Sequence, residues 1–159
     1  MYSGCPAYPA RQLDAHVVYP QNDAVIEPPA DGQPPSRSQT ILIVDDDPSV
    51  ADTFARILKL EGFTVATACN ADEGLGLARD VAPAAIILDM RMPITNGLQF
   101  LKIVRDLPQL VSTPVAIVTG DFFLPDPIQA ELRQLGAEIR FKPLWLEDLI
   151  TLARLLVKA

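Results

Sequence analysis

The chain has 159 residues, enough for one domain of ordinary size, and 49% of them are hydrophobic, which suffices for a core. A formal net charge of −7 argues against a nucleic-acid-binding surface, because phosphate backbones are bound by clustered Lys and Arg. The single histidine, His16, cannot by itself supply a histidine-based metal site or a catalytic triad. No nucleic-acid partner is therefore expected.

The sequence shows no membrane or export signal. No apolar run approaches the roughly 18–20 residues that a membrane-spanning helix needs, and the N-terminus lacks the basic start and apolar stretch of a secretion signal. Two cysteines, Cys5 and Cys69, lie far apart without CxxC spacing, which favours free thiols. We therefore expect a cytoplasmic protein with no membrane partner.

The first 38 residues differ in composition from the rest. Proline fixes φ and removes a backbone donor, so this stretch cannot run as a helix or an inner strand. Residues 1–38 are predicted to be a Pro-rich, mostly disordered tail, and residues 39–159 a folded domain. Two apolar patches, 16–19 and 24–26, leave open whether the tail docks on something or is a solvated leader. The tail contains these prolines: Pro6, Pro9, Pro20, Pro28, Pro29, Pro34 and Pro35.

The predicted domain begins with a strand and a helix. The continuous apolar run over 41–44 is typical of a strand buried on both faces. Asp47 offers an N-cap and Pro48 a first helical position. Apolar residues at helical spacing follow until Gly62, which predicts the end of the helix.

The middle of the chain repeats this alternation. A second strand is predicted over 63–68, and Asn70 caps a second helix that ends before Pro83. A third apolar run, 85–88, predicts a strand, and residues 97–107 have the spacing of a helix.

The last third completes five strand–helix units. Strands are predicted over 115–118 and 138–141, and helices over about 127–135, ending at Gly136, and over 144–157. Strict alternation predicts an α/β fold, a doubly wound five-stranded parallel sheet with helices on both faces and strand order 2-1-3-4-5, as in flavodoxin-like folds.

Chemically distinctive side chains mark the predicted strand ends. Asp45 and Asp46 follow the first strand, Asp89 the third, Thr119 the fourth and Lys142 the fifth. Ligands of open parallel sheets bind beyond the carboxyl ends, where the strand order reverses, here between the first and third strands. Three carboxylates converging there repel one another unless a cation neutralises them. With no His or Cys nearby, the fitting cation is Mg²⁺.

Each of these residues alone has an ordinary explanation, since an Asp at a strand end is usually solvated and Lys142 would be a surface charge. Their joint placement at four of the five strand ends favours phosphoryl chemistry. That chemistry needs a carboxylate nucleophile, a divalent ion, a cation and a hydroxyl donor.

The stretches ILIVDDDP, IILDMRMPITNG, AIVTG and FKP resemble the signature segments of bacterial two-component response regulators, in their receiver domain. The resemblance covers about residues 40–159 and implies the receiver fold. Because the chain stops soon after the last predicted helix, we expect a stand-alone receiver without a DNA-binding output domain. Such a protein signals through contacts with a downstream protein effector.

The resemblance also implies the ligands of the metal. Asp89 would accept a phosphoryl group from the phosphohistidine of a sensor histidine kinase or a histidine phosphotransfer protein. Asp46, Asp89 and the backbone carbonyl of Arg91 would coordinate Mg²⁺, and Asp45 would hold the ion through water.

Thr119 and Lys142 would each contact a phosphoryl oxygen, and the Lys142–Pro143 bond is expected to be cis. The protein would not be a conventional enzyme, although it would catalyse its own phosphotransfer and autodephosphorylation. A homodimer through the fourth helix, fifth strand and fifth helix is a further expectation. The family's usual switch aromatic is replaced by Ile139, which puts the standard aromatic readout in doubt.

Two other interpretations stay open. The first is a phosphorylation-independent, receiver-like protein-binding module. The intact acidic set speaks against it, while Ile139 and the unusual segment 121–127, with Phe122 and Phe123 either exposed or packed, speak for it. The second is an aspartyl phosphohydrolase, which would need an acidic Asp two residues after the nucleophile, where this chain has Arg91.

Overall fold

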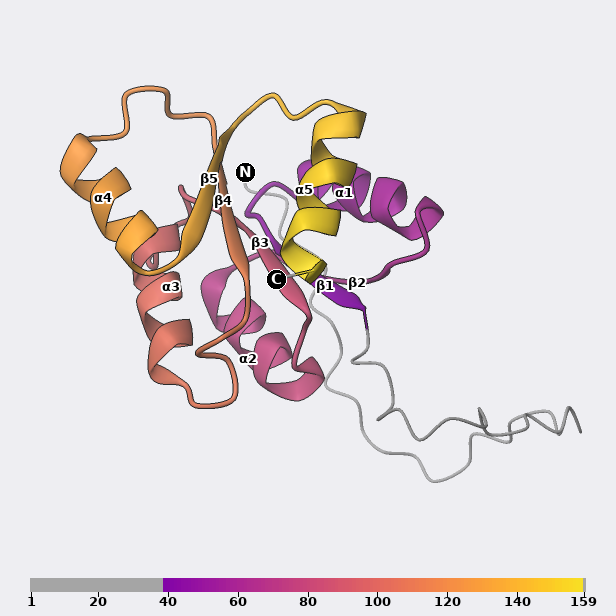
Figure 1. Cartoon of the computed structure of the whole chain (residues 1–159), viewed down its shortest axis with the longest axis horizontal. Helices are drawn as coiled ribbons and strands as arrows, with labels where there is room; N and C mark the ends of the chain where they lie inside the picture. Colours follow the sequence, from indigo (N-terminus) through magenta and orange to yellow (C-terminus); the bar gives the residue numbers. More distant parts are fainter. Residues whose placement is uncertain (1–38, 159) are drawn as a thin grey trace, which may run out of the picture. The chain divides into compact units, whose positions relative to one another are not determined.

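The computed structural model describes residues 39–158, and the predicted tail over 1–38 lies outside the described residues. Strands and helices alternate through this part of the chain (Figure 1). In chain order the elements are β1 (Thr40–Val44), α1 (Pro48–Leu60), β2 (Thr64–Ala68), α2 (Ala71–Val81), β3 (Ala85–Asp89), α3 (Gly97–Asp106), β4 (Val115–Thr119), α4 (Asp126–Gln134), β5 (Ala137–Phe141) and α5 (Leu146–Lys158).

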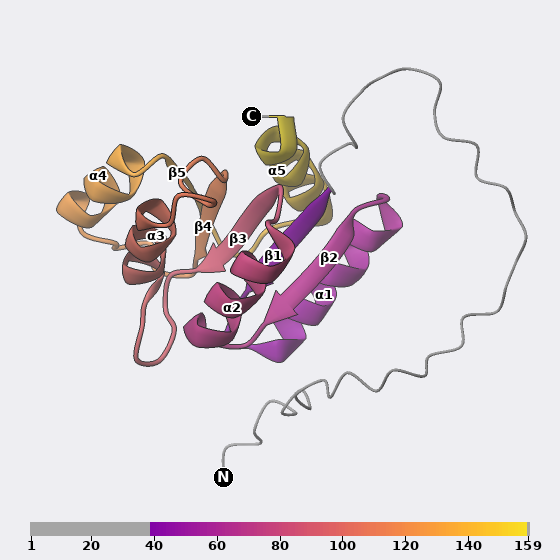
Figure 2. The ribbon, with the colours of Figure 1, turned by 90° about the horizontal axis from the view of Figure 1, so that it is seen from below.

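The strands form one parallel sheet in the order β2-β1-β3-β4-β5, which confirms the predicted fold class and strand order. Because all five run in the same direction, their carboxyl ends lie at one edge (Figure 2). The chain order reverses between β1 and β3, where Val44 pairs with Leu88. The residues that follow these two strands therefore lie side by side.

Each face of the sheet is covered by its own set of helices. Successive side chains of a strand point to opposite faces of the sheet. β1 therefore contributes Leu42 to the hydrophobic cluster on one face and Ile43 to the hydrophobic cluster on the other. Helices α2, α3 and α4 pack on the first face, and α1 and α5 on the second (Figure 1). β1, β3 and β4 are buried along their whole length, as their continuous apolar runs predict.

The helix starts follow the capping residues in the sequence. The Asp47 side chain accepts a hydrogen bond from the backbone N–H of Ser49, and Pro48 opens α1, as predicted. The Asn70 side chain caps α2 in the same way. Asn96 caps α3 through a reciprocal capping box with Gln99, a role that the sequence analysis did not assign to it.

Two expectations are wrong in detail. α5 begins at Leu146 rather than at residue 144, and the N–H of Leu149 bonds to the carbonyl of Trp145 at its start. Cys69 is disulfide-bonded rather than a free thiol, and Cys5 lies outside the described residues. The Lys142–Pro143 bond is cis, as expected. Within residues 39–158, no helix is long and apolar enough to cross a membrane.

Candidate functional site

Three carboxylates meet at the carboxyl edge of the sheet. Asp45 directly follows β1, Asp46 is the next residue, and Asp89 is the last residue of β3. One carboxylate oxygen from each lies within 4.8 Å of the others. Asp45 and Asp89 are buried and Asp46 is exposed, so the group opens to solvent on one side. These oxygen donors suit a hard divalent cation such as Mg²⁺.

Lys142 supplies the positive charge of the site. Its Nζ lies 3.0 Å from Asp45 Oδ2, to which it donates a hydrogen bond, and 3.5 Å from Asp89 Oδ1. Burial lowers the pKa of Lys142, but the Asp45 and Asp89 carboxylates outweigh burial and raise that pKa above its ordinary value. The ammonium group therefore stays charged and bridges two of the three carboxylates.

The pKa of Asp89 is raised to about 6. Burial is the largest cause, and the carboxylate of Asp45 and a hydrogen bond with Asp46 add to it, while Lys142 and the backbone N–H of Arg91 act in the opposite direction. One ammonium group does not compensate three neighbouring carboxylates. The residues present therefore fit a bound divalent cation, which would neutralise the charge that burial penalises.

Thr119 is the last residue of β4, directly after Val118, which pairs with Asp89, and it is fully buried. Its carbonyl accepts a hydrogen bond of 2.8 Å from the backbone N–H of Lys142, which ties the ends of β4 and β5 together. Its Oγ1 accepts a hydrogen bond of 3.1 Å from the backbone N–H of Asp121, so its hydroxyl proton remains available for another acceptor. No Cβ clash would arise at Gly120, where the space is open.

An ion pair that the sequence analysis missed crosses the rim of the site. Arg91 Nη2, in the loop after β3, lies 2.5 Å from Asp121 Oδ2, in the loop after β4. The Arg91 hydrogen bond holds the pKa of Asp121 below its usual range. Nothing in the sequence relates these two residues, which are 30 positions apart. That the backbone carbonyl of Arg91 binds the metal stays a prediction.

A close approach explains the glycine that opens α3. A Cβ on Gly97 would lie 2.9 Å from the carbonyl oxygen of Asp89 and 3.0 Å from the Cα of Met90. The N–H of Gly97 donates a hydrogen bond of 2.9 Å to the carbonyl of Met90. The loop that carries Arg91 thus returns closely onto the backbone of Asp89, which any larger residue would push away.

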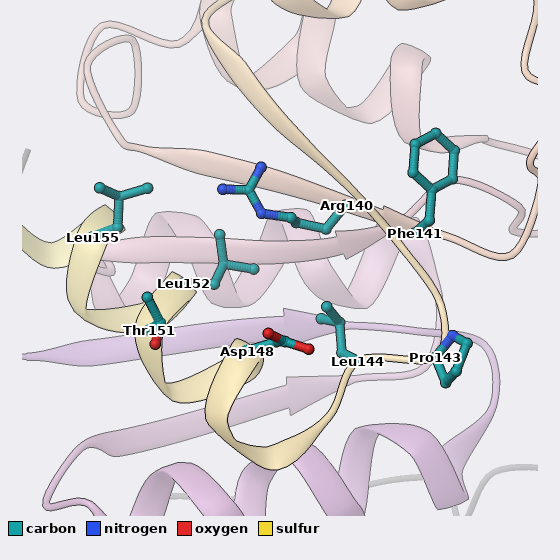
Figure 3. A pocket seen from close by; sticks show the side chains of 8 residues that line it. All are labelled: Arg140, Phe141, Pro143, Leu144, Asp148, Thr151, Leu152 and Leu155. Carbon is teal, nitrogen blue, oxygen red and sulfur yellow. The ribbon is translucent and has the colours of Figure 1, made fainter.

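A shallow apolar groove lies outside the acidic site, between β5 and α5 (Figure 3). Its volume is about 330 Å³. Phe141, at the end of β5, and Leu155, on α5, lie at opposite ends of its lining residues in Figure 3. The groove holds no cluster of acids, so it is a surface feature next to the site rather than part of it.

The chain matches the family model of the response regulator receiver domain over residues 41–154. It therefore belongs to the receiver domains of two-component response regulators, a family that signals through phosphorylation. The match spans every strand and helix that contributes a residue to the site.

Two curated proteins are similar to this chain in sequence. The transcriptional regulatory protein PrrA of Mycobacterium tuberculosis is 32% identical over 121 residues, which cover 76% of this chain and 51% of PrrA. A 14.6 kDa protein of Leptolyngbya boryana is 33% identical over 72% of this chain and 86% of its own length. The chain spans about half the length of the curated relatives it matches, such as PrrA.

Solved structures agree with the fold. The chemotaxis protein CheY4 of Vibrio cholerae has a TM-score of 0.68 and 29% identity, covering 74% of this chain and 97% of its own. A CheY-like receiver domain protein of Methanospirillum hungatei has a TM-score of 0.69 and 26% identity over 76% and 94% of the two chains.

Proposed function

We propose that this domain is a phosphorelay switch that accepts a phosphoryl group on Asp89 in a Mg²⁺-dependent reaction. The observation that carries the proposal is the group of Asp45, Asp46 and Asp89 carboxylates within 4.8 Å, with Lys142 bridging two of them. This arrangement combines a nucleophile, a cation site and a positive side chain at one edge of the sheet.

Asp89 is assigned as the nucleophile because it ends β3, is buried, and has both the Lys142 ammonium at 3.5 Å and the Asp45 and Asp46 carboxylates beside it. One of its oxygens attacks the phosphorus of a phosphohistidine, the P–N bond breaks, and the imidazole nitrogen leaves with the electron pair and takes up a proton. Bound Mg²⁺ would supply charge neutralisation for the phosphoryl oxygens, and Asp45, Asp46, Asp89 and the backbone carbonyl of Arg91 would hold it.

Lys142 and Thr119 act on the transferred group. The Lys142 ammonium already faces Asp89 at 3.5 Å, so it pairs with a phosphoryl oxygen attached there. The hydroxyl of Thr119 has a proton to donate, since its oxygen is only an acceptor in the bond from Asp121 N–H. These two groups recognise the phosphorylated state without forming a covalent bond.

The donor is a sensor histidine kinase or a histidine phosphotransfer protein, and the signal passes on by protein–protein contact. This second part is supported by the net charge of −7, which disfavours binding to nucleic-acid phosphates. The homodimer through α4, β5 and α5 stays a prediction, which sedimentation velocity with and without phosphorylation would test.

The test is the intact mass after incubation with acetyl phosphate, with and without Mg²⁺. We expect one Mg²⁺-dependent phosphoryl adduct in the wild type and none in Asp89→Asn. Asp47→Asn is the matched control, since Asn caps a helix as well as Asp does and Asp47 only caps α1. An unphosphorylated wild type, or an adduct in Asp89→Asn, would overturn the assignment and favour the phosphorylation-independent binding module.

A further inference from the structure

Two aromatic rings join the segment after β4 to the end of β5. The rings of Phe122 and Phe141 are stacked, with centroids 5.5 Å apart and planes inclined by 16°. Phe122 lies three residues after Thr119, and Phe141 directly precedes Lys142. The stack therefore connects the two chain segments that carry the proposed phosphoryl-binding side chains.

The loop after β4 is held by the Arg91–Asp121 ion pair and by a bond from the N–H of Phe123 to Asp121 Oδ1, and two further hydrogen bonds fix it at Thr119. Lys142 N–H bonds to the carbonyl of Thr119 at 2.8 Å, and Asp121 N–H bonds to Thr119 Oγ1 at 3.1 Å. Gly120 contributes no side chain, and the space around it is open. The Phe122 ring is thus a side-chain contact between this loop and β5, and it acts on the loop whose backbone orients the Thr119 hydroxyl.

Hydrophobic burial does not account for the position of these rings. Phe122 is 63% exposed and Phe141 is 37% exposed, so each leaves much of its surface in water. The neighbouring Phe123 is 91% exposed, which shows that the loop can leave a phenylalanine in solvent. An offset stack of two partly exposed rings changes an equilibrium constant by roughly 2- to 10-fold.

We propose that Phe122 and Phe141 are positioning residues for phosphoryl transfer. Their stack holds the loop after β4 against the end of β5 and so fixes the Thr119 hydroxyl and the Lys142 ammonium at the spacing that a phosphoryl group on Asp89 requires. Small displacements of such groups lower binding and transfer without touching the reacting atoms. The inference rests on the proposed function of Asp89 and extends it to two residues outside the site.

The three carboxylates that are proposed to bind Mg²⁺ provide an internal control for the effect of the stack. Asp45, Asp46 and Asp89 come from the ends of β1 and β3, whereas the stacked rings lie after β4 and at the end of β5, and reach the carboxylates only through Lys142. Loss of the stack should therefore weaken binding of the phosphoryl group more than binding of the cation. General loosening of the domain would weaken both, so the two measurements separate positioning from a structural role.

The experiment compares Phe122→Leu with Phe123→Leu, a matched change one residue away on the same loop. Beryllium fluoride serves as the phosphoryl analogue, and its affinity is measured in saturating Mg²⁺ through the fluorescence of Trp145, the single tryptophan of the chain. Mg²⁺ affinity is measured separately from the rise in unfolding temperature with Mg²⁺ concentration. Uptake of phosphate from acetyl phosphate is followed by intact mass.

We expect Phe122→Leu to weaken beryllium fluoride binding and slow phosphate uptake by about 2- to 10-fold, with a smaller change in Mg²⁺ affinity and with Phe123→Leu equal to the wild type. Phe141→Leu should give the same loss, and the double variant should lose no more than either single variant. Equal behaviour of Phe122→Leu and Phe123→Leu, or a parallel loss of Mg²⁺ affinity, would overturn the inference. A wild type that takes up no phosphate from acetyl phosphate would instead overturn the proposed function.

Discussion

At the scale of single residues, the site is a balance between buried negative charge and one ammonium group. Asp89 is 8% exposed and adjoins Asp45, so its charged form is penalised by burial and by a like charge. Lys142 reduces this penalty but does not remove it, because the pKa of Asp89 still lies at about 6. In the absence of a cation, the charged form of Asp89 therefore weakens the fold that holds it.

The first prediction concerns Asp89→Asn in the absence of metal. The pKa of Asp89 is about 6 in the folded chain and near 3.8 in the unfolded chain, so the folded state binds more protons between these values. Stability therefore falls as the pH rises from about 4 to above 6, by roughly 3 kcal/mol in total. Asp89→Asn has no ionisable carboxyl at this position, so its stability should not fall in this way as the pH rises.

Urea unfolding in EDTA at pH 7.5 should show Asp89→Asn more stable than the wild type by about 2–3 kcal/mol. At pH 4.5 the gain should shrink to less than half. Asp47→Asn should show neither effect, since its carboxylate is exposed and caps α1. A less stable Asp89→Asn at pH 7.5 would contradict the charge balance described for the site.

At the scale of elements, close packing and local hydrogen bonds fix where the helices lie. α2 contains two glycines within one turn, Gly74 and Gly76, which point in different directions from the helix axis. A Cβ on Gly74 would lie 2.9 Å from Val44 and 3.0 Å from Phe100, both fully buried, whereas a Cβ on Gly76 would have no atom within 4 Å. One glycine is required by the approach of α2 to the sheet, and the other is not.

The second prediction compares alanine at these two positions. Gly74→Ala should destabilise the domain by about 1–3 kcal/mol, because buried side chains of β1 and α3 must move. Gly76→Ala should stabilise it by up to about 1 kcal/mol, because alanine favours a helix over glycine and meets open space. Thermal unfolding of both variants provides the test, and equal effects would show that α2 does not pack as described.

Arg105 joins three elements through its guanidinium group. From α3 its Nε donates to the carbonyl of Leu135 at 2.7 Å, and its Nη1 donates to those of Val111 at 3.2 Å and Thr113 at 2.8 Å. These carbonyls belong to the turn after α4 and the loop before β4. Burial lowers the pKa of Arg105, since its partners are carbonyls rather than carboxylates.

The third prediction is that Arg105→Lys loses most of this connection although it keeps the charge. An ammonium group cannot reach carbonyls on two separate segments as the planar guanidinium does. We expect a loss of about 2 kcal/mol for Arg105→Lys, and a similar loss for Arg105→Met. Unfolding in urea measures both, and a lysine variant as stable as the wild type would show that charge alone matters here.

The sequence predicted the elements well where local signals are strong. Continuous apolar runs identified β1, β3 and β4, and Asp47, Asn70 and Gly62 marked helix boundaries that the structure confirms. The start of α5 was wrong by two residues, because the first helical hydrogen bond depends on backbone geometry after Pro143.

The contacts that surround the site were less predictable. The strand-end rule brought Asp45, Asp89 and Lys142 together, because parallel strands share one carboxyl edge. The pairing of Arg91 with Asp121 depends on how two loops turn over that edge, and no sequence pattern encodes it. The stacking of Phe122 is of the same kind, since the sequence left open whether the ring is exposed or packed.

At the scale of the whole molecule, the site exists only when the entire sheet is folded, because its residues come from the carboxyl ends of different strands. The fourth prediction follows from this. The proposed Mg²⁺ site exists in the folded domain and not among the scattered carboxylates of an unfolded chain, so Mg²⁺ should stabilise the fold by about 1.4 kcal/mol at ten times its dissociation constant.

Thermal unfolding at pH 7.5 with increasing Mg²⁺ measures this effect, and EDTA should reverse it. The shift should diminish below pH 6, because protonated Asp89 is no longer a ligand. Asp46→Asn should reduce the shift, and Asp52→Asn, on an exposed part of α1, should leave it unchanged. Absence of any shift in the wild type would remove the case for a cation site.

The contact between Asp45 and Lys142 spans 97 residues, from the end of the first strand to the end of the last. A ribosome that has translated only β1 to β4 has therefore incorporated Asp89 but not the ammonium group that faces it. Under the proposed function, the complete site arises late in synthesis, once the end of β5 has been made. A nascent or truncated chain without Lys142 would then compete poorly with finished copies of the protein for the phosphate donor.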